Sequence, residues 1–238
     1  MIPRQIHYIW LGNAPKPPIT NMCILSWKEK LPDYQITEWN EQNLDLDRFA
    51  RENRFFAECR KRHIWAYMSD YLRLRVLYER GGIYLDTDMQ MLGSLNPFLS
   101  DSAFAGAEDT MGRVNCAILG CEPHHPVIAR MLSYYDRDIW SDRDCTIPLI
   151  FTKVLQETET VGTVHVYPPE YFYPYPYESK FTPDCLTTKT RAIHWWSASW
   201  QGRLGPYIFL TTKHLSQPLK TLVAAKRVVG FYRRKIAK

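Results

Sequence analysis

The chain has 238 residues, of which 45% are hydrophobic, so it is long and apolar enough to bury a full core and is not expected to be disordered. No run of roughly 18 or more apolar residues occurs, and the N-terminus enters a strand directly, which predicts neither a spanning helix nor a signal peptide. The six scattered cysteines include no C-x-x-C pair and are interpreted as reduced core thiols of a cytoplasmic protein.

The first third of the chain alternates strands and helices. The predicted elements are a strand at Gln5–Leu11, a helix at Thr20–Lys30, a strand at Tyr34–Trp39 and helical segments within Asn43–Arg62. This alternation predicts an α/β sandwich with a mainly parallel sheet. Ligands bind such sheets where strands end and their order reverses, which suits Trp10 and Asp88 at the ends of different strands.

A helix is predicted at Ile64–Arg80, with apolar residues on nearly every side, and is therefore expected to be largely buried. Asp70 and Arg73 lie inside it, three residues apart and on one face, where charges need partners. One interpretation is an Asp70–Arg73 pair that serves only the fold. The other is that both side chains point into a binding site, Asp70 accepting from sugar or ribose hydroxyls and Arg73 donating to oxygen acceptors.

The run Gly81-Gly82-Ile83-Tyr84-Leu85-Asp86-Thr87-Asp88 places two carboxylates one residue apart on a predicted strand. Successive strand side chains point to opposite faces, so Asp86 and Asp88 are expected on the same side, roughly 7 Å apart. The alternative is a solvated turn or an edge-strand face. A divalent cation would relieve the repulsion, and hard oxygen ligands suit Mg²⁺ or Mn²⁺ with open positions for phosphates. The motif therefore indicates a metal-diphosphate site whose partner is a nucleotide.

Further strands are predicted at Ala103–Glu108 and Asn115–Leu119, with a helix from Pro126 to about Ile139. Asparagine is unfavoured inside a strand unless its amide is needed, so Asn115 is either a site residue or a residue of a turn or strand end. The Tyr/Pro stretch at residues 167–177 cannot be a central strand or a helix, because proline removes backbone donors. It is expected to be an ordered loop that packs on the core or an aromatic wall for an acceptor.

The end of the chain is basic. All 25 acidic residues fall within residues 1–184, whereas residues 185–238 contain 11 basic residues and no acidic one. Residues 218–238 suit an amphipathic helix with Lys220, Arg227, Arg234 and Lys238 opposite an apolar stripe. Such a helix either docks on the domain or binds anionic lipid. No nucleic-acid-binding module is recognised, and no nucleic acid partner is expected.

Three segments resemble a known family. The stretch Ser69–Arg73, followed by Gly81-Gly82-x-Tyr84-x-Asp86-x-Asp88, resembles the glycosyltransferases with a DXD-type sugar-binding region, glycosyltransferase family 32. That family includes bacterial capsule and lipopolysaccharide enzymes and is similar in its core to the clostridial glucosylating toxins. Ile2–Gly12 is similar to the family's opening strand, and His194–Trp200 is similar to its closing His/Ser/Trp segment.

The resemblance implies a GT-A fold, a Rossmann-like nucleotide-sugar-binding sandwich, over residues 1–217 as a single domain. It implies a UDP-sugar or similar nucleotide-sugar donor and a Mn²⁺ or Mg²⁺ ion held by Asp86, Asp88 and His194, although His194 is otherwise read as a buried structural histidine. It implies catalytic roles for Asp86, Asp88 and Asn115. The implied donor-binding residues are Trp10, Asp70, Arg73, Tyr84, Ser197, Ser199 and Trp200.

The implied activity is transfer of a sugar, with retention of configuration, to a glycan or lipid-linked acceptor in bacterial surface polysaccharide synthesis. Peripheral contact at the inner face of the membrane is expected if the C-terminal helix binds lipid rather than the domain. No second carboxylate is placed near the anomeric carbon, although Glu108 and Asp109 are candidates, so same-face attack is favoured over a covalent intermediate. The alternatives are a metal-dependent phosphoesterase or nucleotide-sugar hydrolase, and a non-catalytic nucleotide-sugar-binding protein.

Overall fold

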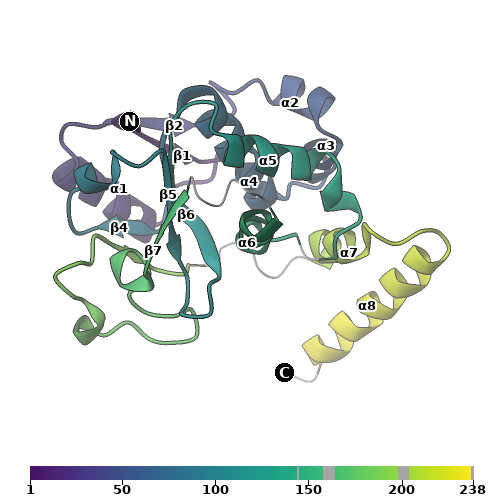
Figure 1. Ribbon diagram of the computed structural model, residues 1–238. Helices are drawn as coiled ribbons and strands as arrows, with labels where there is room; N and C mark the ends of the chain where they lie inside the picture. Colours follow the sequence, from purple (N-terminus) through teal and green to yellow (C-terminus); the bar gives the residue numbers. More distant parts are fainter. Residues whose placement is uncertain (144, 158–163, 198–203, 237–238) are drawn as a thin grey trace.

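The computed structural model of the chain describes residues 1–143, 145–157, 164–197 and 204–236. A central sheet lies between helix α1 on one face and helices α4, α5 and α6 on the other (Figure 1). The helices are α1 (Pro18–Lys30), α2 (Leu46–Glu52), α3 (Arg54–Lys61), α4 (Trp65–Arg80), α5 (Pro126–Asp136), α6 (Ile147–Glu157), α7 (Leu204–Thr212) and α8 (Leu219–Ile236). The strands are β1 (Gln5–Ile9), β2 (Gln35–Trp39), β3 (Gly82–Leu85), β4 (Met89–Met91), β5 (Ala103–Ala107), β6 (Val114–Cys121), β7 (Val164–Tyr167) and β8 (Ala192–His194).

The main sheet has the strand order β2-β1-β3-β6-β5-β7. Strand β1 pairs in parallel with β2 and β3, and β5 pairs in parallel with β7. Strand β6 is antiparallel to both of its neighbours, β3 and β5. The α/β sandwich of the GT-A type is therefore confirmed, and its main sheet is mainly parallel as expected, with β6 running against the other described strands.

Strand alternation divides the core between the two faces of the sheet. On β3, Ile83 and Leu85 pack into the cluster around α1, and Tyr84 points into the cluster around α4, α5 and α6. This is the two-residue period of a strand that is buried on both sides. Helix α4 is largely buried, as expected, because it is apolar on nearly all faces, and its buried apolar residues belong to the cluster around α4, α5 and α6.

Gly81 makes the sharp passage from α4 into β3 possible. Its φ is +64°, and its N–H donates to Leu77 O at 2.8 Å to close the helix. A Cβ atom at this position would lie 2.6 Å from Pro123 Cδ, a distance that no side chain tolerates. Only glycine suits both the backbone conformation and the close packing, and β3 then leads directly to the two aspartates.

The prediction that Asp86 and Asp88 lie on a strand is wrong. Strand β3 ends at Leu85, and residues 86–88 turn the chain into β4, with Met89 N donating to Asp86 O at 3.0 Å. The reason is a second, two-stranded sheet: β4 leaves the main sheet and pairs antiparallel with β8, with Met89 opposite His194. The same-face argument for the two carboxylates therefore fails, and a turn brings them together instead.

The Tyr/Pro stretch is the ordered loop that its prolines predict. Edge strand β7 ends at Tyr167, a 3-10 turn follows at Pro169–Tyr171, and Phe172 and Tyr173 are fully buried beside the sheet. All six cysteines are free; five are buried and Cys185 is half-buried.

Helix α8 occupies the stretch where a C-terminal helix is predicted and lies apart from the sheet, beside α7 (Figure 1). Among the described residues, none of the helices is both long and apolar enough to pass through a bilayer.

Candidate metal and donor site

The predicted site residues gather at one edge of the main sheet. Trp10 follows β1, Asp86 follows β3, and Asn115 is the second residue of β6. Strands β1 and β3 are parallel and β6 runs against β3, so the ends of the first two and the beginning of the third share that edge. This is the edge at which ligands of open α/β sheets bind.

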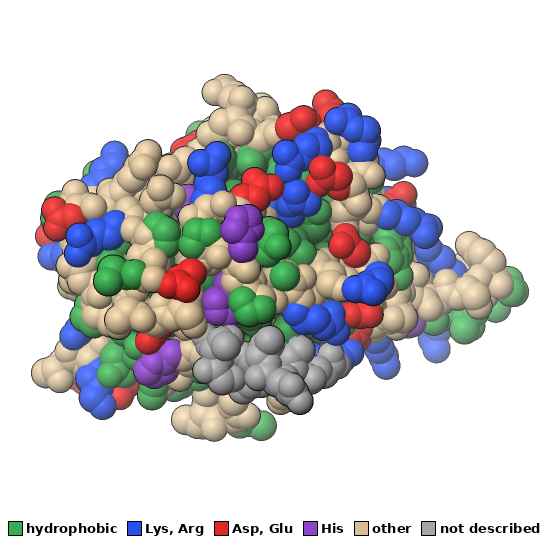
Figure 2. Space-filling view, turned by 45° about the horizontal axis from the view of Figure 1, so that its top comes forward, with side chains coloured by type: hydrophobic (Ala, Val, Ile, Leu, Met, Phe, Trp, Pro, Cys, Tyr) green, Lys and Arg blue, Asp and Glu red, His purple; other side chains and the backbone are tan. Residues whose placement is uncertain are grey.

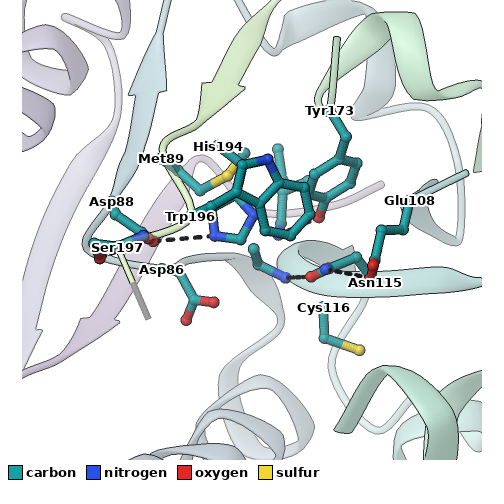
Figure 3. Close-up of polar contacts among 12 residues, drawn as sticks. Asp86, Asp88, Met89, Glu108, Asn115, Cys116, Tyr173, His194, Trp196 and Ser197 are labelled. Carbon is teal, nitrogen blue, oxygen red and sulfur yellow. Dashed lines mark hydrogen bonds and ion pairs between the residues drawn. The ribbon is translucent and has the colours of Figure 1, made fainter. Parts of the chain in front are cut away.

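Asp86, Asp88 and His194 form a cluster of potential metal ligands. Each offers one ligand atom, and these atoms lie within 4.8 Å of one another. His194 Nε2 lies 3.2 Å from Asp88 Oδ1 (Figure 3). The β4–β8 pairing produces this arrangement, because it sets His194 opposite Met89, the residue that follows Asp88. The structure thus brings together the three residues that the sequence nominates as metal ligands.

Asp88 is held by the segment that follows β8. Its Oδ2 accepts from Ser197 N at 2.9 Å and from Ser197 Oγ at 2.8 Å, and the residue is only 8% exposed. Burial acts to raise the pKa of Asp88, but the neighbouring His194 and the Ser197 donors outweigh it and hold that pKa well below its usual range. Asp88 is therefore a carboxylate at any ordinary pH.

Asp86 is held by helix α4 and by strand β3, which precedes it. Its Oδ1 accepts from Tyr84 Oη at 3.1 Å and lies 3.1 Å from Arg73 Nη2. Arg73 Nη2 also donates to Asp70 Oδ1 at 2.7 Å, and Arg73 Nη1 donates to Cys116 O at 2.9 Å. The Asp70–Arg73 pair of the structural interpretation therefore exists, and through Arg73 it reaches the site. Asp86 has 29% side-chain exposure and is the more open of the two carboxylates.

Burial also shifts the pKa of Asp70 within this network. It raises the pKa of Asp70 to about 7, against the attraction of Arg73 and with a smaller contribution from Asp86. The Arg73 guanidinium also lies 4.3 Å from the centre of the Tyr84 ring, a cation–π distance. Tyr84 is 2% exposed, so in this structure it is a buried residue that supports Asp86 and Arg73.

Asn115 lies at an irregularity of β6. The pairing with β5 passes from Ala105–Leu119 to Gly106–Asn115, so β6 bulges between these pairs. Asn115 Oδ1 accepts from Ala117 N at 2.8 Å, and its Nδ2 donates to Glu108 Oε2 at 2.9 Å (Figure 3). The amide therefore holds the bulge in shape, which explains an asparagine inside a strand. Its role beside the donor sugar stays a prediction.

Trp10 is half-buried at the end of β1. Its Nε1 donates to Ala14 O at 2.8 Å, and Lys16 Nζ lies 5.5 Å from the centre of its ring. A base would stack on this ring at the same sheet edge as Asp86, and that contact stays a prediction. Ser199 and Trp200, also nominated as donor-binding, lie outside the described residues.

Trp196 and Tyr173 are site residues that the sequence did not reveal. Their rings contact His194 with centroid distances of 4.1 and 5.7 Å (Figure 3). The sequence indicates only that Trp195 and Trp196 are apolar, which favours core positions for both. Tyr173 is hidden among many similar aromatic residues of the Tyr/Pro stretch, and no local signal distinguishes it.

The cluster suits a divalent cation. Two carboxylates and one imidazole make the mixed oxygen and nitrogen set that Mn²⁺ accepts, and Mg²⁺ accepts the carboxylates. Asp86 keeps the cluster open to solvent, whereas Asp88 and His194 are buried. Arg73 neutralises part of the local negative charge, and a cation would neutralise more of it.

The chain combines a GT-A-type sheet with an Asp-x-Asp motif at one edge of that sheet. The family model described as "Glycosyltransferase sugar-binding region containing DXD motif" matches residues 17–105, which confirms the resemblance. The matched stretch includes the buried charge pair of α4 and both aspartates of the turn.

Relatives and solved structures agree with this assignment. The human lactosylceramide 4-alpha-galactosyltransferase is 29% identical over 218 residues, which cover 80% of this chain and 58% of the relative. The PaToxG glycosyltransferase has a TM-score of 0.54 at 20% identity, covering 67% of this chain and 71% of its own. The UDP-bound glycosyltransferase domain of the YGT toxin has a TM-score of 0.51 at 11% identity, covering 95% and 89%. The structural likenesses establish the fold, and the chain spans about half the length of the lactosylceramide relatives it matches.

Proposed function

We propose that this chain transfers a sugar from a nucleotide-sugar donor to a hydroxyl of a glycan or lipid-linked acceptor, with a bound Mn²⁺ or Mg²⁺ ion. The observation that carries the proposal is the cluster of Asp86, Asp88 and His194 at the ligand-binding edge of a GT-A sheet. A site for a leaving diphosphate needs a cation where charge develops, and this edge supplies its ligands.

Each side of the cluster holds one carboxylate in place. Ser197 and His194 hold Asp88, and Arg73 and Tyr84 hold Asp86. When bound, the cation would neutralise the charge of the departing nucleoside diphosphate. Groups fixed in advance in this way need no reorganisation as the bond to the sugar breaks, which lowers the barrier.

We infer retention of configuration by same-face attack. Asp109 Oδ1 accepts from Met111 N and Arg113 N within its own loop. Glu108 Oε2 accepts from Asn115 Nδ2, and Glu108 Oε1 lies 3.4 Å from Arg113 Nη1. Both candidate nucleophiles are thus engaged. In same-face attack the bond from the anomeric carbon to the phosphate oxygen breaks, the bond to the acceptor oxygen forms, and the acceptor proton passes to the leaving phosphate oxygen.

The names of similar proteins suggest which substrates to test first. UDP is the nucleotide bound to the YGT toxin domain, and the human relative is named as a galactosyltransferase acting on lactosylceramide. We infer a UDP-sugar donor and take lactose-terminated glycolipid as one acceptor to test. A lipid-linked precursor of a bacterial surface polysaccharide, the acceptor expected from the sequence resemblance, is the other.

The deciding experiment incubates the protein with a panel of nucleotide sugars, Mn²⁺ and these acceptors, and identifies the products. Transfer predicts release of nucleoside diphosphate that increases with acceptor and disappears with EDTA. A phosphoesterase would instead release nucleoside monophosphate or sugar phosphate, and a binding protein would release nothing. Asp88→Asn, which keeps the size of the side chain, is the matched inactive control.

We also infer that α8 contacts the inner face of a membrane. Lys226 is exposed, and Leu222 on the same helix is 66% exposed, so charge and apolar surface are both available for an anionic bilayer. Over the face in Figure 2, Lys and Arg side chains alternate with Asp and Glu among the coloured residues, without an extended field of one sign. On this face the mixed charges offer no extended basic patch for a nucleic acid.

A further inference from the structure

Trp196 lies two residues after His194 and one before Ser197, and it has an unusual backbone conformation. Its φ is +51°, in the left-handed region that a bulky residue rarely adopts. Residues held there without glycine carry strain and occur preferentially at functional sites. Its neighbours in the chain are Trp195 and Ser197, both of which bond to Asp88 through their backbone N–H groups.

The left-handed turn folds the chain back onto Asp88. Before the turn, Trp195 N donates to Asp88 O at 3.0 Å. After it, Ser197 N and Ser197 Oγ donate to Asp88 Oδ2 at 2.9 and 2.8 Å. An extended residue at 196 would carry Ser197 away from Asp88, because successive residues of a strand diverge from a single partner. The conformation of Trp196 therefore delivers the donors that fix the carboxylate.

The Trp196 ring fixes the imidazole in turn. Its centroid lies 4.1 Å from that of His194, and Tyr173 contacts the imidazole edge-on at 5.7 Å. His194 Nδ1 is buried and has no hydrogen-bond partner among the described residues. Metal-binding histidines ordinarily have the second ring nitrogen held by a hydrogen bond, which sets the ring orientation. Here aromatic packing takes that place, and Trp196 is itself fixed by its Nε1, which donates to Tyr175 O at 3.2 Å.

We propose that Trp196 is a positioning residue that preorganises the divalent-cation site. Its ring orients His194, and its backbone brings Ser197 to Asp88. The inference rests on the proposed function only in taking His194 and Asp88 as cation ligands, and it requires no particular sugar or acceptor.

The test measures binding of Mn²⁺ alone to the full chain by calorimetry, after treatment with EDTA and dialysis. Trp196→Gly keeps a residue that adopts positive φ and removes the ring, so Mn²⁺ affinity should fall on the order of tenfold or more. Trp196→Phe retains a ring and should recover most of the affinity. If the glycine variant does not fold, Trp196→Leu removes the aromatic ring while keeping an apolar side chain.

Trp195→Ala is the matched control, because it removes the same side chain one residue earlier. The Trp195 ring packs on Phe181, and its Nε1 donates to Gln90 Oε1 at 3.0 Å. Its loss should lower the melting temperature without changing Mn²⁺ affinity. An equal loss of affinity in both tryptophan variants would reduce Trp196 to general packing and overturn the proposal.

A double-mutant cycle with His194→Ala separates positioning from structure. If Trp196 acts through His194, Trp196→Gly should weaken Mn²⁺ binding much less in the His194→Ala background than in the wild type. Equal losses in both backgrounds would overturn the proposal. Unchanged Mn²⁺ affinity in His194→Ala itself would remove the metal site of the proposed function as well, and nucleoside diphosphate release from a nucleotide sugar would then decide separately whether the transferase activity stands.

Discussion

The two aspartates of one short motif belong to two differently built regions. Asp86 is held by residues close in sequence, Arg73 and Tyr84, which come from α4 and β3. Asp88 is held by His194 and Ser197, more than 100 residues further along the chain. We call these two sets of contacts the Asp86 anchor and the Asp88 anchor. The Asp86 anchor is made by elements of the main sheet and its helix, and the Asp88 anchor depends on the small β4–β8 sheet. Two aspartates separated by a single residue thus depend on segments that lie far apart in the sequence.

The largest expected effect falls on the stability of the Asp86 anchor. Arg73→Met should lower the free energy of unfolding by about 3–5 kcal/mol, because Asp70 and Asp86 lose the buried guanidinium between them. Urea titration measures this. The control is Arg48→Gln, which also removes an arginine paired with two acids, Glu52 and Glu79, but at 42% side-chain exposure. It should cost about 1 kcal/mol or less, and comparable losses in the two variants would contradict the prediction.

The next effect falls on activity at the Asp88 anchor. Asp88→Asn should reduce the rate of nucleoside diphosphate release by about a hundred- to a thousandfold, since the neutral amide loses the charge that a cation requires. Circular dichroism should show that the fold survives. Turnover near that of the wild type with Mn²⁺ present would remove Asp88 from the machinery.

A third prediction concerns the pH dependence of the free energy of unfolding, through His7 of β1. His7 Nδ1 accepts from Trp39 Nε1 at 3.2 Å and its Nε2 lies 3.0 Å from Gly81 O, so the neutral ring satisfies both partners. Burial lowers the pKa of His7 from 6.5 to about 4. The unfolded chain therefore binds the proton more readily, and about 3 kcal/mol of stability should be lost as pH falls from 6.5 to 4.

The measurement for His7 is the free energy of unfolding across that pH range. His7→Gln can donate to Gly81 O and accept from Trp39 but does not titrate, so its curve should be flatter by that amount. Parallel curves for the two proteins would show that the histidine does not carry the dependence.

A smaller effect is expected for donor binding beside the Asp86 anchor. Trp10→Ala should weaken the affinity for UDP by one to two decades, because stacking a base on an aromatic ring is worth about 1–3 kcal/mol. Calorimetry with UDP and Mn²⁺ tests this. Unchanged affinity would assign Trp10 to the core alone.

The smallest effect per residue is expected outside both regions, on α8. The triple variant Lys220→Gln, Lys226→Gln and Arg227→Gln should lose up to about 1 kcal/mol of affinity for anionic vesicles per residue. A control triple, Lys28→Gln, Lys61→Gln and Lys180→Gln, should bind as the wild type does. Co-sedimentation at low salt measures both, and equal binding by all three proteins would make α8 a docked structural helix.

The contrast between the two anchors also explains what the sequence could predict. The buried α4, its charge pair and the passage through Gly81 are local patterns, and they identify Asp86 together with its partners. The closing segment with His194 could be recognised by resemblance, but not the atoms that it contacts. A strand was expected through Asp88 because the run follows directly after the helix-ending Gly81-Gly82. Only β8, which comes more than 100 residues later, determines that the chain turns there.

The details that the sequence did not reveal have the same origin. The antiparallel direction of β6 and its bulge at Asn115 depend on pairing between strands, and an amide that closes a bulge looks in sequence like an amide kept for a ligand. The left-handed Trp196 has no sequence signature, because tryptophan is not a residue that predicts such a conformation. The contacts that complete the site are therefore those that local patterns reveal least.

The distance along the chain between Asp88 and Ser197 also orders events during protein synthesis. The two residues are 109 positions apart, and a ribosome adds about 5–20 residues per second. Asp88 is therefore made on the order of ten seconds before the donors that fix it. For that interval the nascent chain can have its Asp86 anchor but not the donors that hold Asp88, so the proposed cation site is complete only after residue 197 has been added.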